Sequence, residues 1–342
     1  MPIQTMTKHE TVVLAGDIGG TKTRLAVFSS ERGLKTPLMT ATFPSQHYAG
    51  LEDIVQKFLS QVPIKVNCAS FGVAGPVVNG QATITNLPWV MDEKRLAEVL
   101  KIPQVYLMND TLASAQALPV LTSQEIFTLN QGCAAPGGVM AVIAVGTGLG
   151  ETYLVHNGTR YQAYPSEGGH ADFAPTTAEE TRLLQHLLDR FDHVSTERVC
   201  SGIGIENIYN FLKETGPDTE PMWLTRQIEA GHDPVPVIVS AGLDNKRPCG
   251  LCQSTLNRFI SILGAETGNL ALKTMAIAGV YLGGGIPPRI VSALQNGLFM
   301  KAFRHKGRLS TLMETFPVHV ILNSEAALLG AALRGLDFQF DG

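Results

Sequence analysis

The feature that most constrains the fold is a turn rich in glycine and threonine that follows a short apolar strand pattern. Residues 16–21 and residues 146–150 form two such turns, and each is followed by a second apolar run. A third glycine-rich turn lies at residues 283–286, again after an apolar run. Several backbone N–H groups can converge in a turn only where Cβ atoms do not block them. The first two patterns therefore suggest a duplicated fold whose halves each present a backbone turn to one ligand.

Strand patterns and helix patterns follow one another along the chain, which is typical of an α/β architecture. Strands are predicted at residues 12–17, 23–28, 38–43, 69–74, 83–86, 105–108, 139–145, 152–155, 277–282 and 318–322. Helices are predicted at residues 51–62, directly after the strand at 105–108, at 177–191, over a long stretch that begins near residue 249, and at 324–334.

Two of these helices carry local signals. Thr177 and Glu180 form a capping box, in which each side chain is expected to bond the backbone N–H of the other. The long helix carries a stripe of small residues at Gly264, Gly268 and Ala271. Such a stripe lets another element approach closely, so we interpret it as core packing.

The bulk properties exclude several classes of protein. A length of 342 residues predicts two domains or lobes, and 44 % hydrophobic residues with 16 % charged residues exclude general disorder. A net charge of −4 without a Lys/Arg run argues against a nucleic-acid partner and an anionic membrane partner. No apolar run approaches the ~20 residues of a membrane-spanning helix, and no apolar signal-peptide core is present. Five cysteines, an odd number, favour a reducing compartment, and we expect the cytoplasm.

Two of the cysteines form a single CxxC pattern, Cys249 and Cys252. A structural zinc site needs four ligands, and neither a second cysteine pair nor a histidine cluster lies nearby in the sequence. A thioredoxin-like motif would follow a strand, whereas this pair begins a helix pattern. We expect two unreactive thiols.

The glycine-rich turns are candidates for binding the phosphates of a nucleotide. Each follows a strand, which is where α/β folds place their ligands, although any one turn could also be a plain hairpin or a bend into a helix. Asp17 can hold a hydrated magnesium ion, and the hydroxyls of Thr21 and Thr147 can donate to phosphoryl oxygens. The patterns GxxxxGK[ST] and GxGxxG are absent, which excludes a Walker-type site and a Rossmann dehydrogenase.

Three further segments carry polar groups suited to a sugar or to proton transfer. Asp110 follows Asn109 at a strand end and could accept the proton of a substrate hydroxyl, although either residue could instead cap the next helix. Two glycines separate Glu167 from His170, which indicates a shaped loop, with a surface turn as the alternative. Glu197 by itself is better interpreted as a solvated residue in the first turn of a helix.

Taken as an ordered set, these segments resemble the bacterial-type glucokinase family, within the superfamily of sugar kinases, actin and heat-shock chaperone ATPases. The resemblance covers nearly the whole chain after the first ten residues. It rests on GDIGGTKTRLAVF (16–28), FGVAGPV (71–77), TNLPW (85–89), MNDTLA (108–113), AVGTGLG (144–150), SEGGHADFAP (166–175), ERVCSGIGIENIY (197–209) and GGGIPPR (283–289).

The resemblance implies a two-lobed actin-like or ribonuclease H-like ATPase fold with an active cleft between the lobes. Residues 1–120, completed by a C-terminal helix at 323–342, would form a small α/β lobe, and residues 121–322 a large α/β lobe. The implied activity is the transfer of a phosphoryl group from ATP, with Mg²⁺, to glucose, which gives glucose 6-phosphate at the entry to glycolysis. A homodimer is also implied.

The same resemblance implies roles for individual residues. Asp110 would be the general base on the 6-hydroxyl of the sugar, Asn109 would fix the sugar, and Glu167, His170 and Glu197 would bind ring hydroxyls. Asp17 would hold magnesium through water. The nucleotide would contact Gly16, Asp17, Gly19, Gly20, Thr21, Thr147, Gly148, Gly284 and Gly285, the last two near the adenosine.

Two departures from the family pattern and two alternative functions remain open. Lys22 stands where the family often has Asn, and we expect it to face solvent rather than phosphate. No cysteine follows His170, which disfavours the regulators that carry zinc there. A kinase of another hexose or of an N-acetylhexosamine is the nearer alternative. A non-catalytic sugar sensor is the other, but it would need a DNA-binding segment before the first strand and could dispense with Asp110.

Overall fold

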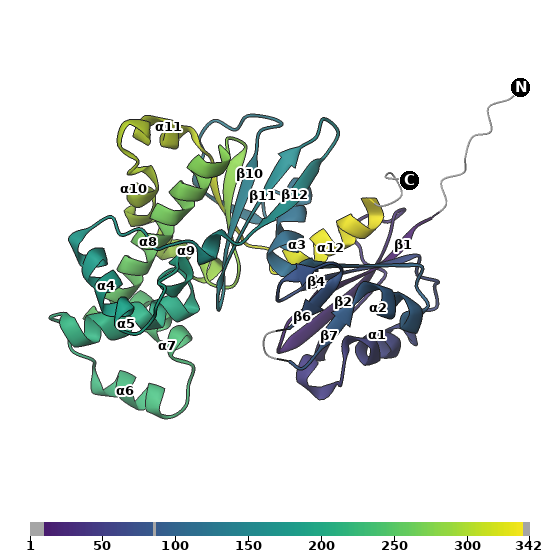
Figure 1. The fold of residues 1–342 in the computed structure, drawn as a ribbon, viewed down its shortest axis with the longest axis horizontal. Helices are drawn as coiled ribbons and strands as arrows, with labels where there is room; N and C mark the ends of the chain where they lie inside the picture. Colours follow the sequence, from purple (N-terminus) through teal and green to yellow (C-terminus); the bar gives the residue numbers. More distant parts are fainter. Residues whose placement is uncertain (1–9, 85–86, 338–342) are drawn as a thin grey trace, which may run out of the picture. The chain divides into compact units, whose positions relative to one another are not determined.

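The computed structural model describes residues 10–84 and 87–337, and the chain divides into two compact units (Figure 1). Unit 1 consists of Met1–Leu121 and Ser324–Gly342, and unit 2 consists of Thr122–Asn323. Each unit contains a mixed sheet with helices packed on it, so the chain is an α/β protein, as the alternating patterns predict.

The main sheet of unit 1 has five strands in the order β3-β2-β1-β4-β8. Their bounds are β1 Val12–Ile18, β2 Lys22–Ser29, β3 Met39–Pro44, β4 Cys68–Val73 and β8 Gln104–Asn109. β1, β4 and β8 are parallel, and their register pairs Asp17 with Gly72 and Gly72 with Met108. The carboxyl ends of these three strands therefore meet at one edge of the sheet.

Helices cover both faces of this sheet (Figure 1). The helices α1 (Leu51–Leu59) and α2 (Glu93–Leu100) lie on one face, where Leu51, Ile54, Val55 and Phe58 enter the core. The helices α3 (Asp110–Gln116) and α12 (Ala326–Asp337) lie on the other face. Gly330 of α12 leaves no room for a Cβ beside the carbonyl oxygen of Ala113, so these two helices pack closely. A small antiparallel sheet, β5 (Val77–Val78), β6 (Gln81–Thr83) and β7 (Val90–Asp92), completes unit 1.

Unit 2 repeats the sheet arrangement of unit 1. Its strands are β9 Ile126–Asn130, β10 Met140–Val145, β11 Leu149–His156, β12 Tyr161–Ser166, β13 Gly279–Gly283 and β14 Val318–Ile321, in the order β12-β11-β10-β13-β14-β9. In both units a first strand pairs with an antiparallel hairpin partner on one side and with parallel strands on the other. The prediction of a duplicated fold is confirmed.

The core of unit 2 forms around the long helix α8 (Gly250–Thr274). Gly264 and Gly268 lie directly against the carbonyl oxygens of Phe299 and Phe303 in α10 (Leu298–Arg304). The small-residue stripe therefore packs a helix, as predicted. The remaining helices are α4 (Ala178–Leu188), α5 (Gly202–Thr215), α6 (Met222–Glu229), α7 (Pro234–Leu243), α9 (Val291–Leu294) and α11 (Ser310–Thr315).

Several local predictions need correction. Thr177 caps α4 by accepting the N–H of Glu180, but the Glu180 carboxylate bonds the N–H of Thr176 at 2.7 Å instead of that of Thr177. Glu197 lies in a 3-10 helix, Thr196–Arg198, and not in an α-helix. The strand expected at 83–86 ends at Thr83, and residues 85–86 lie outside the described residues, as do the last five residues of the helix expected at 323–342.

The CxxC pair lies at the start of α8, as predicted, and has a structural role there. Both cysteines are buried, and the Sγ of Cys249 caps the helix by accepting the N–H of Cys252 at 3.3 Å. Burial raises the pKa of the Cys252 thiol far above its ordinary value, which keeps this thiol protonated. In the part of the chain that the structure describes, no helix combines the length and apolarity needed to cross a bilayer.

Candidate active site

In unit 1, two carboxylates lie at the edge where the parallel strands end. Asp17 is the sixth residue of β1, and Asp110 begins α3 directly after β8. Gly72 of β4 lies in register with Asp17, and a Cβ on Gly72 would lie 3.8 Å from the Cα of Asp110. The missing side chain at Gly72 thus lets α3 pack closely against β4, because a Cβ there would lie 2.9 Å from the Cβ of Ala113. The strand-end placement that the sequence predicts for both residues is observed.

The two carboxylates influence each other electrostatically. Burial is the main cause that raises the pKa of Asp17 to about 6, the Asp110 carboxylate adds to the rise, and Arg24 opposes it. Burial also raises the pKa of Asp110, against hydrogen bonds that favour its charged form. Two half-buried acids with raised pKa values at one strand edge are typical of a site for a proton or a cation.

Asn109 holds the helix that carries Asp110. Its Oδ1 accepts the N–H of Thr111 at 2.9 Å and that of Leu112 at 3.4 Å, and its Nδ2 donates to the carbonyl oxygen of Gly75 at 3.1 Å. Asn109 is therefore the N-cap of α3, which is the alternative that the sequence left open. The side chain of Asn109 also hydrogen-bonds the Asp110 carboxylate, which favours the charged form of that group.

The glycine-rich turn between β1 and β2 is held by a residue that sequence reasoning missed. Buried Ser45 donates its hydroxyl to the carbonyl oxygen of Gly19 at 2.7 Å, and its N–H bonds the carbonyl oxygen of Thr21 at 3.0 Å. Gly16 lies inside β1, where a Cβ would meet the ring of Phe71 at 2.6 Å, so its missing side chain serves packing. No local pattern identifies Ser45, since its partners are more than twenty residues away.

The side chains around this turn differ in their surroundings. Gly19 donates its N–H to the carbonyl oxygen of Lys22 at 3.0 Å, which closes the turn, and Gly20 lies half-buried at its tip. Thr21 and Lys22 are exposed, so the Thr21 hydroxyl is accessible to a ligand. The exposure of Lys22 agrees with its expected position in solvent.

In unit 2, the turn after β10 lies against the start of α5. Gly146 donates its N–H to the carbonyl oxygen of Gly148 at 3.0 Å, and Gly202 donates to the carbonyl oxygen of Gly146 at 2.8 Å. Thr147 is exposed. The first residues of α5 thus anchor the turn, and the positive end of a 14-residue helix lies beside it, which suits an anion.

The turn at residues 283–286 lies beside the first turn of unit 2. Gly284 has a φ of +83° and packs against the backbone of Val145, where a side chain would not fit. Ile286 donates its N–H to the carbonyl oxygen of Val145 at 3.1 Å. A Cβ on Gly285 would meet nothing within 4 Å. The structure thus brings Thr147, Gly148, Gly284 and Gly285 to one end of the sheet and leaves open space there.

Glu167 and His170 project from a 3-10 helix, Gly168–His170, that lies on β11. Their carboxylate Oε2 and imidazole Nε2 are 4.0 Å apart, and the side chains are 80 % and 60 % exposed. Gly168 contacts the carboxylate of Glu151, and Gly169 contacts the carbonyl oxygen of Leu149, so neither position has room for a side chain. The two glycines therefore let the loop lie flat on the strand while both polar groups face outward.

Glu197 lies between the segment of Glu167 and His170 and the glycine-rich turn at residues 146–150. Its carboxylate Oε2 accepts the N–H of Leu149 at 2.9 Å, and a Cβ on Gly148 would lie 2.5 Å from the same oxygen. Thr196 bonds the carbonyl oxygen of Ala171 at 2.8 Å, which ties the 3-10 helix of Glu197 to the segment after His170. The three residues of unit 2 predicted to bind a sugar are thus gathered in one region next to residues 146–148.

Comparison with known proteins gives consistent likenesses over nearly the whole chain. A family model described as Glucokinase matches residues 14–336. A glucokinase of Nostoc punctiforme is 42 % identical, over 94 % of this chain and 98 % of its own length. The crystal structure of a glucokinase from an Antarctic psychrotroph has a TM-score of 0.80 at 31 % identity, and covers 95 % of this chain and 99 % of its own.

A more distant structure has the same fold. A glucokinase of the ROK family from Streptomyces griseus, solved in complex with glucose and AMPPNP, has a TM-score of 0.61 at 19 % identity and covers 95 % of this chain and 99 % of its own. These likenesses confirm the resemblance stated from the motifs, and they confirm the two-lobed actin-like fold that the resemblance implies.

Proposed function

The chain belongs to the glucokinase family, and on this basis we propose that it transfers the γ-phosphoryl group of ATP to glucose and releases glucose 6-phosphate. The observation that carries the proposal is the position of Asp110 beside Asp17, at the strand edge where α/β folds bind ligands. The Streptomyces griseus protein of the same fold binds a sugar and an ATP analogue together, which supports the same pair of ligands here.

We assign the general base to Asp110. Phosphoryl transfer depends on positioning and charge neutralisation more than on covalent chemistry, so the protein must mainly hold the 6-hydroxyl in line with the γ-phosphorus. Asp110 takes the proton of this hydroxyl as the oxygen becomes acidic during transfer. Its raised pKa brings it closer to neutral pH than an exposed aspartate, which improves it as a base.

We assign sugar binding to Asn109, Glu167, His170 and Glu197. The exposed groups of Glu167 and His170 offer an acceptor and a second polar partner for vicinal ring hydroxyls. Glu197 accepts from Leu149 through one oxygen and keeps its other oxygen for the sugar. Asn109 contributes its amide group beside the base, while its bonds to Gly75 and Thr111 fix the start of α3.

We assign the phosphates of ATP to the backbone turns at residues 16–21 and 146–148, with hydroxyls from Thr21 and Thr147. The open space at Gly285, next to the tightly packed Gly284, suits the adenosine. All three turns lie at strand ends, where main-chain N–H groups can face an anion.

Asp17 fits a magnesium ion. Its carboxylate is a hard oxygen donor that lies near a second carboxylate with both pKa values raised, a charge arrangement that a divalent cation would relieve. Among the described residues no cluster of three or more His, Cys, Asp or Glu side chains is arranged to hold a metal ion, so phosphate oxygens and water would complete the coordination. Bound there, magnesium neutralises phosphate charge.

We also propose that the protein acts in the cytoplasm, at the entry to glycolysis, as a homodimer. The family resemblance and the free cysteines support the compartment. Light scattering on the purified chain measures its mass in solution, and a monomer at all concentrations would contradict the dimer.

A coupled assay over several sugars and donors tests the activity itself. Glucose with ATP and Mg²⁺ should give the highest kcat/KM, ahead of mannose, fructose and N-acetylglucosamine. ADP and polyphosphate should serve poorly as donors. A higher kcat/KM on an N-acetylhexosamine would favour the alternative substrate class, and no turnover on any sugar would favour a sensor.

A further inference from the structure

Two carboxyl groups are buried together in unit 2, behind the predicted sugar loop. Glu151 of β11 is 4 % exposed, and Glu266 of α8 is 6 % exposed. The two side chains are in hydrogen-bonding contact with each other. On each of them the Oε1 atom is buried and has no hydrogen-bond partner among the described residues. Two carboxylates cannot bond without a proton, because both are acceptors only.

The charged and titratable groups around this pair offset its charge only in part. Lys273 of α8 is the nearest cation, with its Nζ 3.8 Å from Oε1 of Glu266, beyond hydrogen-bond distance. Lys306, which follows α10, directs its ammonium to the carbonyl oxygen of Ala265 and to Oδ1 of Asn269. The Cys200 thiol, before α5, is fully buried, and its pKa is raised by burial and by both glutamates, so it adds no positive charge.

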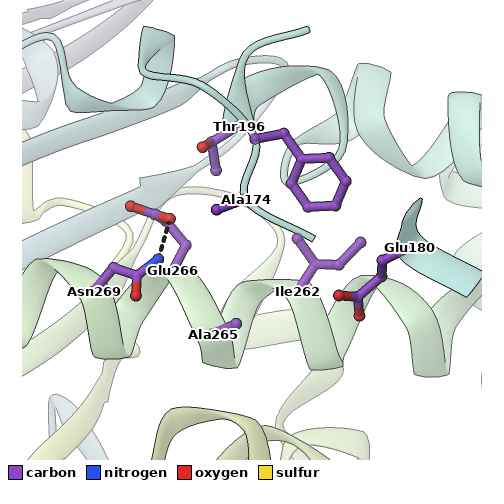
Figure 2. A pocket seen from close by; sticks show the side chains of 8 residues that line it. Ala174, Glu180, Thr196, Ile262, Ala265, Glu266 and Asn269 are labelled. Atoms are coloured by element: carbon purple, nitrogen blue, oxygen red, sulfur yellow. Dashed lines mark hydrogen bonds between the residues drawn. The ribbon is translucent and has the colours of Figure 1, made fainter. Parts of the chain in front are cut away.

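The pair touches both segments that carry the predicted sugar residues. The Glu151 carboxylate lies directly against Gly168, which separates Glu167 from His170. Glu266 lines a small pocket together with Thr196, the residue before Glu197 (Figure 2). In Figure 2 the side chain of Glu266 rises from α8 toward the segment of Thr196 and Ala174, and Asn269 donates to its Oε2 at 3.0 Å. The carboxyl pair therefore packs against the segment of Glu167 and His170 and lies near the segment of Glu197.

We propose that Glu151 and Glu266 share one proton, and that this shared proton positions the Glu167–His170 loop and the Glu197 segment for sugar binding. The inference rests on the proposed function, because it assigns these two segments to the sugar. Both glutamates act as positioning residues, since neither lies among the exposed groups that face the sugar. With the proton in place, an O–H···O bond joins β11 to α8 and supplies the missing donor.

The sense of the pH dependence follows from burial. Burial, with the Glu266 charge second and Lys273 opposing, raises the pKa of Glu151 to about 7. At low pH the shared proton therefore stabilises the packing of β11 on α8. This stabilisation is lost as the pH rises through about 7. Above that pH both glutamates are charged, so a further rise in pH should not change the KM for glucose through this pair.

The test compares the KM for glucose of the wild type and of Glu151→Gln as a function of pH. For the wild type, KM should rise about threefold or more from about pH 5.5 to about pH 8 and then level off. Gln is neutral and can donate to Glu266. The KM of Glu151→Gln for glucose should therefore stay low over this pH range and should not show the rise expected for the wild type. The KM for ATP should follow neither pattern. Because the raised pKa values of Asp17 and Asp110 add their own pH dependence, the evidence is the difference between the two proteins.

A matched control and an independent measurement accompany this test. Glu220→Gln changes a partly buried glutamate of unit 2 that bonds Tyr209 and Thr225, and should leave the pH dependence of the wild type unchanged. If Glu151→Gln does not fold, Glu266→Gln replaces it. Difference infrared spectra between about pH 5.5 and about pH 8 should show the wild type losing a protonated-carboxyl C=O band that Glu151→Gln lacks. Asp17, whose pKa is about 6, contributes its own band to both proteins.

The outcomes are separable from those of the proposed function. An active enzyme in which Glu151→Gln retains the full pH dependence of the glucose KM overturns the shared proton, and so does the absence of the infrared band. An inactive wild-type protein that shows the band and its loss in Glu151→Gln contradicts the glucokinase activity, while the shared proton stands.

Discussion

The carboxylate of Glu197 accepts the backbone N–H of Leu149 at 2.9 Å, immediately after the glycine-rich turn of unit 2. One side chain assigned to the sugar thus stabilises the backbone assigned to phosphate. We therefore expect this hydrogen bond to couple the two proposed binding sites of unit 2, so the effects of substituting Glu197 and Glu167 should differ.

Glu197→Gln and Glu167→Gln separate these two roles. Glu197→Gln weakens the bond to Leu149 and should raise the KM values for glucose and ATP together, each about three- to tenfold. Glu167→Gln leaves the turn intact and should raise only the KM for glucose. Steady-state kinetics with each substrate varied in turn measures both effects. Equal changes in the two variants would remove the coupling role of Glu197.

Asp110→Asn removes the base and preserves the shape. Turnover should fall about 10²- to 10⁴-fold, while the affinity for glucose, measured by fluorescence titration, stays within about threefold. Asp92→Asn is the control, because Asp92 is another aspartate at the start of a helix of unit 1, where it accepts the N–H of Arg95. Asp110→Asn turnover within a few-fold of the wild type would refute the assignment of the base.

Gly72→Ala should displace α3. Its new methyl group would lie 2.9 Å from the Cβ of Ala113, so the helix that begins with Asp110 must shift. We expect a loss of about 1–3 kcal/mol in the free energy of unfolding, together with a reduced kcat. Adding Ala113→Gly removes the opposing methyl group and should restore much of the kcat, even though a helical glycine costs about 1 kcal/mol. A kcat unaffected by Gly72→Ala would show that this spacing does not position Asp110.

Ser45→Ala should loosen the first phosphate turn. It removes the bond from the Ser45 hydroxyl to the carbonyl oxygen of Gly19, at a cost of about 1 kcal/mol in stability, and should raise the KM for ATP but not for glucose. Ser60→Ala removes a comparable bond at the exposed end of α1 and serves as the control. If both variants change the ATP KM equally, the turn does not depend on Ser45.

Asp17 gives a prediction with a definite sign against pH. Its pKa of about 6 lies above the ordinary value, so the proton is bound more tightly by the folded chain than by the unfolded one. Its contribution to stability is therefore greatest below pH 3.8 and is lost as the pH rises through about 6. Asp17→Asn should unfold at a higher temperature than the wild type at neutral pH without magnesium, and should be inactive. An unchanged or lower melting temperature would contradict the burial of a charged Asp17.

The sequence was sufficient to predict the strands and turns that carry the site. Apolar runs such as those of β1, β4 and β10 are buried on both faces, and each predicts its own strand. The positions of the site residues can be predicted from these strands. Asp17 lies near the end of β1, Asp110 directly follows β8, and Thr147 lies in the turn after β10. The edge strand β12 was missed because its residues are half-buried or exposed and include a proline, so no apolar face marks it.

Contacts between residues distant in the chain could not be predicted. No sequence pattern links Glu151 of β11 to Glu266, and only the packing of α8 places Glu266 beside it. Ser45 likewise reaches Gly19 through the tertiary fold. Of the predicted capping box, the bond from the N–H of Glu180 to Thr177 is present, and the return bond is not. The sequence pattern does not show which backbone N–H the Glu180 carboxylate accepts, and in the structure it is that of Thr176.

The packing of α12 on α3 determines when unit 1 can be assembled. α12 follows the whole of unit 2 in the chain, yet Gly330 and Gly335 fit against Ala113 and Val13 of unit 1. During synthesis the first 121 residues leave the ribosome long before α12 does. The helix that begins with Asp110 therefore lacks its packing partner until unit 2 has been translated. We expect the protein to become active only after α12 has been synthesised and has packed on α3.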